Sequence, residues 1–194
     1  MLDSLDISLL REINVNRITS LDSAFIFITQ TAPIIVACIP LAFIIIGFIR
    51  KKKKIWIEGF MIATPYLLSG IILNIIKVFA QRPRPFISYT YIQKLSDGGS
   101  SSFPSGHTSD AFSIAMIVSL FFPKAAIVIP MLLWAALVGY SRMDLGVHYP
   151  TDVLAGAILG ICSSLFCHWF FKRFRNRDIT PVLNQEERMV HGEK

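Results

Sequence analysis

Five apolar stretches, most of them long enough to cross a bilayer, restrict the fold of this chain more than any other feature. A transmembrane helix needs about 20 mostly apolar residues, and we predict helices of this kind at 24–49, 55–80, 105–122, 125–140 and 153–171. The fourth stretch is short, so we expect it to extend into residues 141–145. Only 16% of the 194 residues are charged, whereas a soluble domain would have roughly a quarter. These features exclude a soluble globular enzyme.

The positive charges predict how the helices are oriented. Although the net charge is +6, the basic residues lie in short blocks between the apolar stretches. One block is 50–54, and another follows the last stretch and consists of Lys172, Arg173, Arg175 and Arg177. Because Lys and Arg are enriched in cytoplasmic loops, we expect both blocks in the cytoplasm. Segments 81–104 and 141–152 and the first 22 residues are then expected on the opposite side.

The amino-terminal segment is expected to form a helix in the interface of the outer leaflet. Apolar side chains recur there at helical spacing among polar ones: Leu2, Leu5, Leu9, Leu10 and Ile13. Such amphipathic spacing is typical of interfacial helices, and a disordered leader is the alternative. No cleaved signal peptide is expected, since no apolar stretch precedes residue 24.

We therefore predict an all-α membrane protein with a bundle of about five transmembrane helices, or six if the amino-terminal segment also spans. Its parts would be an extracytoplasmic interfacial helix (1–22), a transmembrane domain (23–175) and a polar cytoplasmic tail (176–194). Gly156 and Gly160 form a pair of small residues that lets helices approach closely. We expect this pair to serve packing within the bundle in preference to dimerisation.

Polar and ionisable residues collect at those ends of the apolar stretches that face outward. Ionisable groups are costly to bury in a membrane and therefore mark functional sites. Membrane anchors or helix caps would explain each residue alone, but such residues would occur at both faces. The cluster consists of Lys77, Arg82, Arg84, Ser105, Gly106, His107, Arg142, His148 and Asp152.

The composition of this cluster predicts a site for a phosphate group. Arginine offers paired donors to phosphate oxygens, and lysine offers a point charge. Pro104 precedes a helix start at Ser105, Gly106 and His107, where backbone amides are expected to be free and to bind an anion. Gly106 would also let the anion approach the backbone closely.

A second helix start at Pro150 carries the reactive groups. If His148 lies just before the first turn, the carboxylate of Asp152 can fold back to reach one ring nitrogen. That contact would fix the tautomer and make the other nitrogen a better nucleophile or base. His107 would then be free to act as a proton donor.

These residues form three motifs that resemble the signature of the type 2 phosphatidic acid phosphatases, the PAP2 family of integral membrane lipid phosphatases. The motifs are Lys77 with Arg84-Pro85, Pro104-Ser105-Gly106-His107, and Ser141-Arg142 with His148 and Asp152. The resemblance covers 77–152 and the flanking apolar stretches, which is most of the chain. Many members have six transmembrane helices, so the position of the amino end differs from the family pattern.

The resemblance implies a role for each motif residue. His148 would take the phosphoryl group as a phosphohistidine, Asp152 would orient it, and His107 would protonate the leaving oxygen. The family uses no metal, in agreement with the lack of a carboxylate cluster suited to magnesium, so we expect no cofactor. The implied phosphate-binding residues are Lys77, Arg84, Ser105, Gly106 and Arg142.

The implied function is hydrolysis of a lipid phosphate or diphosphate on the extracytoplasmic side of a bacterial cytoplasmic membrane. Undecaprenyl diphosphate, phosphatidylglycerol phosphate and phosphatidic acid are the expected substrates; a lipid A phosphatase or phosphotransferase of the same family is the alternative. The lipid substrate would stay in the bilayer. We expect the protein to bind no nucleic acid and to need no obligatory protein partner. An anion transporter, from another class, would need polar residues that continue to the inner face, and the sequence offers few beyond Asp110.

Several residues near the motifs have two interpretations. Asp110, one turn after His107, either holds that imidazole as a second-layer partner or is a charge at the helix start. Asp144 either pairs with Arg142 or is exposed. Arg82 lies outside the signature and is expected to contact only lipid headgroups. Cys162, Cys167 and His168 could form a metal site only with a fourth ligand, which the sequence does not offer nearby. We therefore expect these side chains to serve packing.

Overall fold

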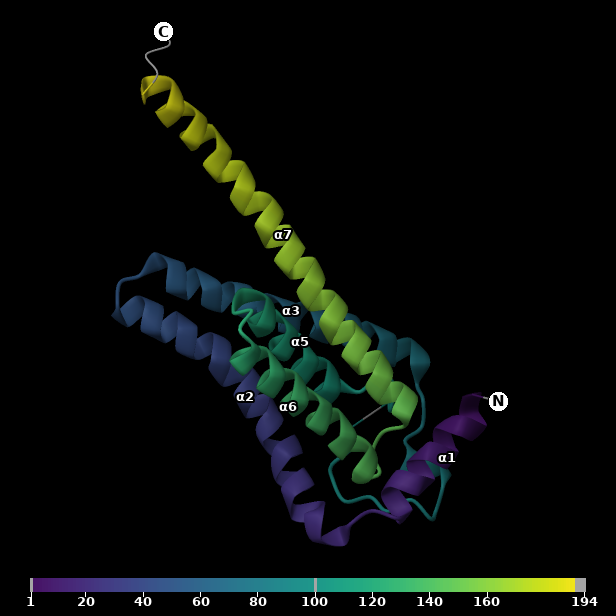
Figure 1. Cartoon of the computed structure of the whole chain (residues 1–194). Coiled ribbons are helices and arrows are strands. Elements are labelled where there is room, and N and C mark those ends of the chain that lie inside the picture. Colours follow the sequence, from purple (N-terminus) through teal and green to yellow (C-terminus); the bar gives the residue numbers. More distant parts are fainter. Residues whose placement is uncertain (1, 100, 191–194) are drawn as a thin grey trace.

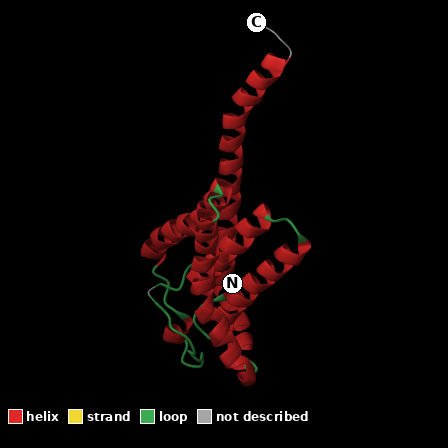
Figure 2. Ribbon diagram, turned by 90° about the vertical axis from the view of Figure 1, so that its left-hand side faces the viewer, coloured by secondary structure: helices red, strands yellow, loops and turns green. Residues whose placement is uncertain are grey.

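The computed structural model describes residues 2–99 and 101–190, with side chains for 4–99 and 101–174. Within that part of the chain there are helices and loops but no strands (Figure 2). A short 3-10 turn, Thr19–Leu21, joins the first two helices. In chain order the helices are α1 (Leu2–Val15), α2 (Asp22–Ile49), α3 (Lys53–Ala80), α4 (Pro85–Ser88), α5 (Gly106–Phe121), α6 (Ala125–Asp144) and α7 (Pro150–Val190) (Figure 1).

The prediction of an all-α membrane bundle is confirmed. Four segments are long and apolar enough to cross a membrane: Thr19–Ile49, Lys53–Ser88, Ala125–Asp144 and Pro150–Phe174. The remaining predicted span, the third in chain order, is α5, which has only 16 residues. As expected, the short fourth span extends beyond residue 140, because α6 runs through Asp144.

Helix α5 lies at the centre of the bundle and contacts α2, α3, α6 and α7. Because neighbouring helices surround it, it can bury polar groups that lipid would not accept. Ser113 shows this: its hydroxyl lies 3.0 Å from that of Ser69 on α3, and its carbonyl accepts a 2.7 Å hydrogen bond from Ser164 on α7. Hydrogen bonds as well as apolar packing therefore hold the central helix in place.

Two glycines of α7 allow it to lie directly against α5. A Cβ atom on Gly156 would stand 2.5 Å from the carbonyl oxygen of Ser105, and one on Gly160 would stand 2.4 Å from that of Ser109. Both distances are too short for a side chain, so the pair serves packing within the bundle. Farther along α7, His168 contacts the ring of Phe121 edge-on. The described residues contain no group of His, Cys, Asp or Glu that could hold a metal ion.

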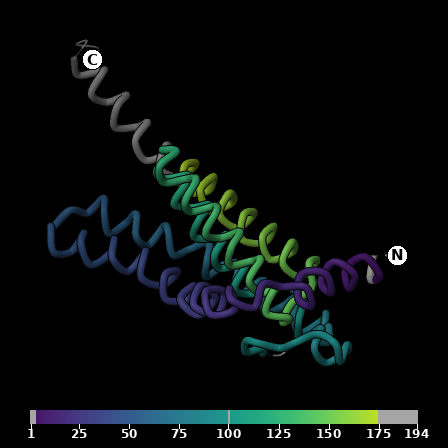
Figure 3. The backbone as a smooth tube through the Cα atoms, turned by 60° about the horizontal axis from the view of Figure 1, so that its bottom comes forward, coloured from purple at the N-terminus to yellow at the C-terminus, as the bar shows by residue number. Residues whose placement is uncertain are grey.

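Helix α1 lies against the end of the bundle, beside α6, α7 and the loop after α4 (Figure 3). Its inner side is partly polar, since Asp6, Leu10 and Asn14 are buried. The amide of Asn14 donates to the carbonyls of Asp144 (2.7 Å) and Gln93 (3.0 Å). The segment is thus a docked helix and not a disordered leader.

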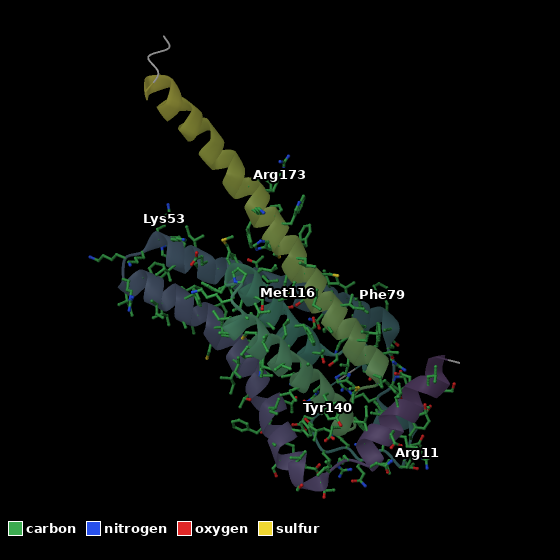
Figure 4. All side chains as sticks on the ribbon, viewed as in Figure 1. Arg11, Lys53, Phe79, Met116, Tyr140 and Arg173 are labelled. Atoms are coloured by element: carbon green, nitrogen blue, oxygen red, sulfur yellow. The ribbon has the colours of Figure 1, made fainter. Side chains whose placement is uncertain are left out.

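The two basic blocks lie toward the same end of the bundle, opposite the end where α1 lies. Lys53 and Arg173, from the two basic blocks, lie toward one end, whereas Arg11 of α1 lies at the other (Figure 4). Helix α7 continues to Val190, beyond the end predicted for the last span at residue 171. The last residues of the predicted tail, 191–194, lie outside the described residues.

Candidate active site

The predicted site residues come together at the end of the bundle where α1 lies. The chain reverses direction from helix to helix, so α3 and α6 end where α5 and α7 begin. Lys77 and Arg142 lie in the last turns of α3 and α6, and Arg84 is the residue before α4. The beginnings of α5 and α7 supply the other members: Ser105, Gly106, His107, His148 and Asp152.

The contacts of His148 identify its tautomer. Its Nδ1 lies 3.4 Å from Oδ2 of Asp152, and its Nε2 lies 3.3 Å from a terminal nitrogen of Arg84. A guanidinium can only donate hydrogen bonds, so Nε2 is the acceptor and the proton is on Nδ1, facing the carboxylate. The 3.4 Å contact is long for a hydrogen bond, as is common before a catalytic site binds its substrate. Nε2 therefore carries a lone pair on the side of the cations.

Burial keeps the His148 ring neutral. The side chain is only 2% exposed, and loss of hydration lowers the pKa of His148 to about 4. The contact with the Asp152 carboxylate opposes this change, and the charges of Arg84 and Arg142 add to it. At neutral pH the ring is therefore unprotonated at Nε2, which faces Arg84.

This low pKa predicts a measurable difference from an ordinary histidine. At about pH 5.5, one unit below the ordinary histidine pKa of about 6.5, the His148 ring should still be neutral. Imidazole nitrogen chemical shifts of ¹⁵N-histidine-labelled protein in detergent would show this, with the signal assigned by its loss in His148→Asn. A His148 signal that titrates near the ordinary value would contradict the prediction.

Asp152 is held from several directions. Its Oδ2 accepts hydrogen bonds from the Tyr149 amide (2.9 Å) and the Ser102 hydroxyl, and its Oδ1 accepts one from Arg82 (2.7 Å). The contact with Tyr149 is half of a capping box, in which a residue of the first turn reaches back to the amide before the helix. The carboxylate that faces His148 is thus fully buried and fixed.

The start of α5 differs from the expectation in one respect. The amide of Ser105 is not free, because it donates a 3.0 Å hydrogen bond to the carbonyl of Asp152. The Ser105 hydroxyl is also engaged, 2.8 Å from that of Thr108. The amides that follow, beginning with Gly106, belong to the first turn, where an α-helix provides no internal acceptor. They remain suited to an anion.

Carbonyl oxygens of the loop before α5 contact the cations of the site. A terminal nitrogen of Arg142 donates to the carbonyl of Asp97 (3.1 Å). Nε of Arg84 donates to that of Gly99 (3.1 Å) and Nζ of Lys77 to that of Ser101 (3.3 Å). A phosphate oxygen carries charge and forms stronger hydrogen bonds than a peptide carbonyl. The cations thus lie together and point to one region.

His107 lies in the first turn of α5 and within electrostatic range of Arg142, His148, Arg84 and Lys77. Among the described side chains it makes no hydrogen bond with Asp110, so Asp110 does not hold the imidazole in this structure. Asp110 instead lines a groove between α3 and α5.

The family follows from comparison with known proteins. The family model described as the PAP2 superfamily matches residues 56–176, which include every motif residue. The chain belongs to the PAP2 superfamily. It is 32% identical over 142 residues to the undecaprenyl-diphosphatase BcrC of Bacillus subtilis, a match that covers 73% of this chain and 70% of that protein.

Solved structures of PAP2 proteins have the same fold. LpxE of Aquifex aeolicus superposes with a TM-score of 0.73 at 31% identity, over 84% of this chain and 94% of that one. A transmembrane PAP2-type phosphatidylglycerolphosphate phosphatase from Bacillus subtilis gives 0.76 at 26% identity, over 89% and 87%. This PAP2 chain is a multi-pass membrane protein and a lipid phosphate hydrolase.

Two expectations for residues near the PAP2 motifs are wrong. Arg82 does not contact only lipid headgroups: it donates to Asp152 (2.7 Å) and to Asp6 of α1 (2.6 Å). Asp144 is buried, not exposed, and among the described residues it forms no ion pair with Arg142. One feature of the sequence could have indicated this role of Arg82: it lies between Lys77 and Arg84, the two signature positions of the first motif.

Other contacts of the PAP2 site had no signal in the sequence. The hydroxyl of Thr29 on α2 accepts a 2.6 Å hydrogen bond from Arg142. Ser102 bonds to Asp152, and Asp6 comes from a helix predicted only to lie in the interface. These contacts depend on how distant segments meet in the fold.

Proposed function

We propose that this PAP2 phosphatase removes a phosphoryl group from a lipid phosphate or diphosphate at the extracytoplasmic face of a bacterial cytoplasmic membrane. One observation carries the proposal: the unprotonated Nε2 of His148 faces the guanidinium of Arg84 at 3.3 Å, on the side where Lys77 and Arg142 also lie. A phosphate bound by these cations would have its phosphorus atom next to the nucleophile.

In the proposed reaction, Nε2 of His148 attacks phosphorus and the bond from phosphorus to the leaving oxygen breaks. The charge of the bound phosphate offsets the cations around His107 and lets that ring carry a proton. His107 gives this proton to the leaving oxygen, and the dephosphorylated lipid leaves. The positive charge that develops on the His148 ring is stabilised by Asp152 on the Nδ1 side. Water, with its proton taken by His107, then cleaves the N–P bond and releases inorganic phosphate.

The phosphate would be bound by Lys77, Arg84, Arg142 and the amide groups at the start of α5. Its oxygens would replace loop carbonyls as acceptors for the cations. These donors are already in place before the reaction, so they can stabilise the charge on the transferring group without rearrangement. No metal ion is needed for this electrostatic role.

Gly106 offers a test of the backbone contact. A Cβ atom there would meet only Leu73, at 3.9 Å, so packing within the chain does not require glycine. We expect Gly106→Ala to fold normally but to lose activity, on the order of 10-fold or more, because the methyl group would occupy the place of the phosphate. Phosphate release and thermal unfolding of the purified variant would be measured.

Gly156→Ala is the matched control, because its Cβ would stand 2.5 Å from the Ser105 carbonyl oxygen. That variant should lose stability. Full activity of a well-folded Gly106→Ala protein would show that phosphate does not approach this backbone.

The groove between α3 and α5 suits the lipid tail of the substrate. It has a volume of about 340 Å³, and Gly106 and Asp110 line it on the α5 side. On the α3 side its lining includes Leu67 and Ile71, which are 59% and 61% exposed on the outside of the bundle. The groove therefore extends from the phosphate site to the lipid-facing surface, and the tail could remain in the bilayer during the reaction.

Undecaprenyl diphosphate is the leading substrate, supported by the similarity to BcrC over most of both chains. Phosphatidylglycerol phosphate is supported by a structural neighbour, and phosphatidic acid and lipid A remain to be compared. The test is phosphate release by purified protein in detergent, from each of these lipids, with chelator present. Turnover of none of them would refute the proposal, and turnover that needs added magnesium would refute its metal-free mechanism.

The side of the membrane is tested separately. In a variant without the native cysteines, a cysteine at Thr90, exposed in the loop after α4, should react with a membrane-impermeant thiol reagent in intact cells. A cysteine at Lys124, exposed between α5 and α6, should not react. We expect this pattern because Lys and Arg blocks mark the cytoplasmic side. The opposite pattern would place the reaction in the cytoplasm.

A further inference from the structure

Arg82 bridges two carboxylates that lie far apart in the chain, Asp6 and Asp152. One terminal nitrogen donates to Oδ1 of Asp152 at 2.7 Å, and the other donates to Oδ2 of Asp6 at 2.6 Å. The guanidinium also lies over the ring of Tyr149, 3.9 Å from its centre. Both terminal nitrogens of the guanidinium are hydrogen-bonded and one of its faces lies against Tyr149, so Arg82 is held in one orientation.

Asp6 is bound to the beginning of α7 as well. Its Oδ1 accepts a hydrogen bond from the amide of Thr151 (2.9 Å), and its Oδ2 accepts one from the hydroxyl of the same residue (2.6 Å). A carboxylate next to the first amides of a helix is favoured by the helix dipole. Asp6 is 4% exposed, and all of these partners belong to Arg82 or to the segment that carries Asp152.

We propose that Asp6 and Arg82 are positioning residues of the phosphatase, so that helix α1 completes the active site. The inference rests on the proposed function, in which Asp152 orients His148. Arg82 holds Oδ1 of Asp152, which leaves Oδ2 turned toward Nδ1 of His148. Asp6 holds Arg82 in that position.

Charge balance gives Asp6 a second effect. Arg82 has one positive charge between two carboxylates. If Asp6 becomes neutral, Asp152 alone balances the positive charge of Arg82. The negative electrostatic potential that Asp152 creates at the His148 ring is then weaker. The preference of the ring for the tautomer with the proton on Nδ1 would then be weaker. This is the tautomer in which Nε2 can act as the nucleophile.

The competing explanation is that Asp6 has a purely structural role and only docks α1. A variant of Asn14 distinguishes this explanation from a positioning role. Asn14 docks the same helix through hydrogen bonds to Asp144 and Gln93. Neither of these residues contacts Arg82 or Asp152. Asn14→Ala therefore weakens docking without changing the charges around Asp152.

The kinetic experiment compares Asp6→Asn, Asp6→Glu and Asn14→Ala in the full-length enzyme. For Asp6→Asn, kcat should fall about 10-fold or more, a loss typical when a group that orients a site residue is removed, while KM changes little. Asp6→Glu, which keeps the carboxylate, should restore part of kcat, and Asn14→Ala should resemble the unmodified enzyme. Equal losses for Asp6→Asn and Asn14→Ala would overturn the proposal in favour of docking.

A second readout does not depend on activity. Nitrogen chemical shifts of ¹⁵N-labelled histidines report the tautomer of His148 at neutral pH. A single Nδ1-protonated form in the unmodified protein and in Asn14→Ala, with a mixture in Asp6→Asn, would support the proposal. An unchanged tautomer in Asp6→Asn would overturn it. If no lipid phosphate is hydrolysed, the proposed function fails, yet this measurement still decides whether Asp6 acts on His148.

Discussion

Replacement of His148 by alanine is expected to abolish hydrolysis of every lipid phosphate and diphosphate. Nε2 of His148 lies 3.3 Å from the guanidinium of Arg84, and in the proposed reaction this nitrogen forms the bond to phosphorus. Without that nitrogen no phosphoryl intermediate can form. The loss should therefore be the same for all leaving groups. Folding would be checked by size-exclusion chromatography, with His168→Ala, on the helix that follows His148, as a control.

His107→Ala should behave differently, because general acid catalysis matters most when the leaving oxygen is strongly basic. Its usual contribution is about 10² to 10⁴-fold. An alkoxide that leaves from a lipid monophosphate needs the proton, whereas a lipid phosphate that leaves from a diphosphate, or a nitrophenolate from an artificial ester, needs it much less. The variant should thus lose most activity on monophosphates.

Substrates graded by the pKa of the leaving group would measure this difference. Equal losses for His107→Ala on all substrates would argue against the acid role and for a role in phosphate binding. Graded residual activity in His148→Ala would mean that the two histidines have the opposite roles.

The sequence predicts those parts of the site that depend on local spacing. His148 and Asp152 are separated by one helical turn, so a contact between them requires only that a helix begin at Pro150. The convergence of Lys77, Arg84 and Arg142 follows from alternating helix direction, because all three lie at ends of apolar stretches that face the same side. The charge blocks and apolar stretches fix that alternation.

The remaining contacts depend on tertiary packing. Asp6 and Arg82 are 76 residues apart in the chain, and nothing in the periodicity of α1 shows that its polar side would turn toward the protein. The helix looks amphipathic, yet Leu5 and Leu9 are each 54% exposed while Asp6 is buried. An amphipathic pattern predicts two faces but not which partner the polar face meets.

Tertiary packing also explains why the amide of Ser105 is not free. A helix start after Pro104 predicts free amides, but the carbonyl of Asp152 approaches from α7 and accepts the first of them. That approach is possible because Gly156 removes the side chain that would separate α7 from α5. The sequence shows the glycine, whereas the contact that it permits is visible only in the fold.

Arg142 should not tolerate lysine, although the charge is kept. Its guanidinium donates in separate directions, to the hydroxyls of Thr29 (2.6 Å) and Ser96 (3.2 Å) and to the carbonyl of Asp97 (3.1 Å). An ammonium group cannot reproduce the planar, paired donors that bind phosphate oxygens. We expect Arg142→Lys to lose activity on the order of 10-fold or more, since this donor acts in a site that excludes water.

Arg17→Lys is a matched control for that experiment. Arg17 has a guanidinium on the same side of the bundle, 6% exposed, that contacts Asp22, Asn14 and Gln93 but none of the phosphate-binding residues. Both substitutions remove hydrogen-bond donors of an arginine that joins separate segments, so both should lower the thermal unfolding temperature, while only Arg142→Lys should lower kcat/KM for lipid phosphate. A fully active Arg142→Lys enzyme would show that Arg142 does not bind phosphate. Equal losses of activity in both variants would mean that Arg142 has a structural role, in which it holds Thr29 of α2 to Ser96 and Asp97 of the loop before α5.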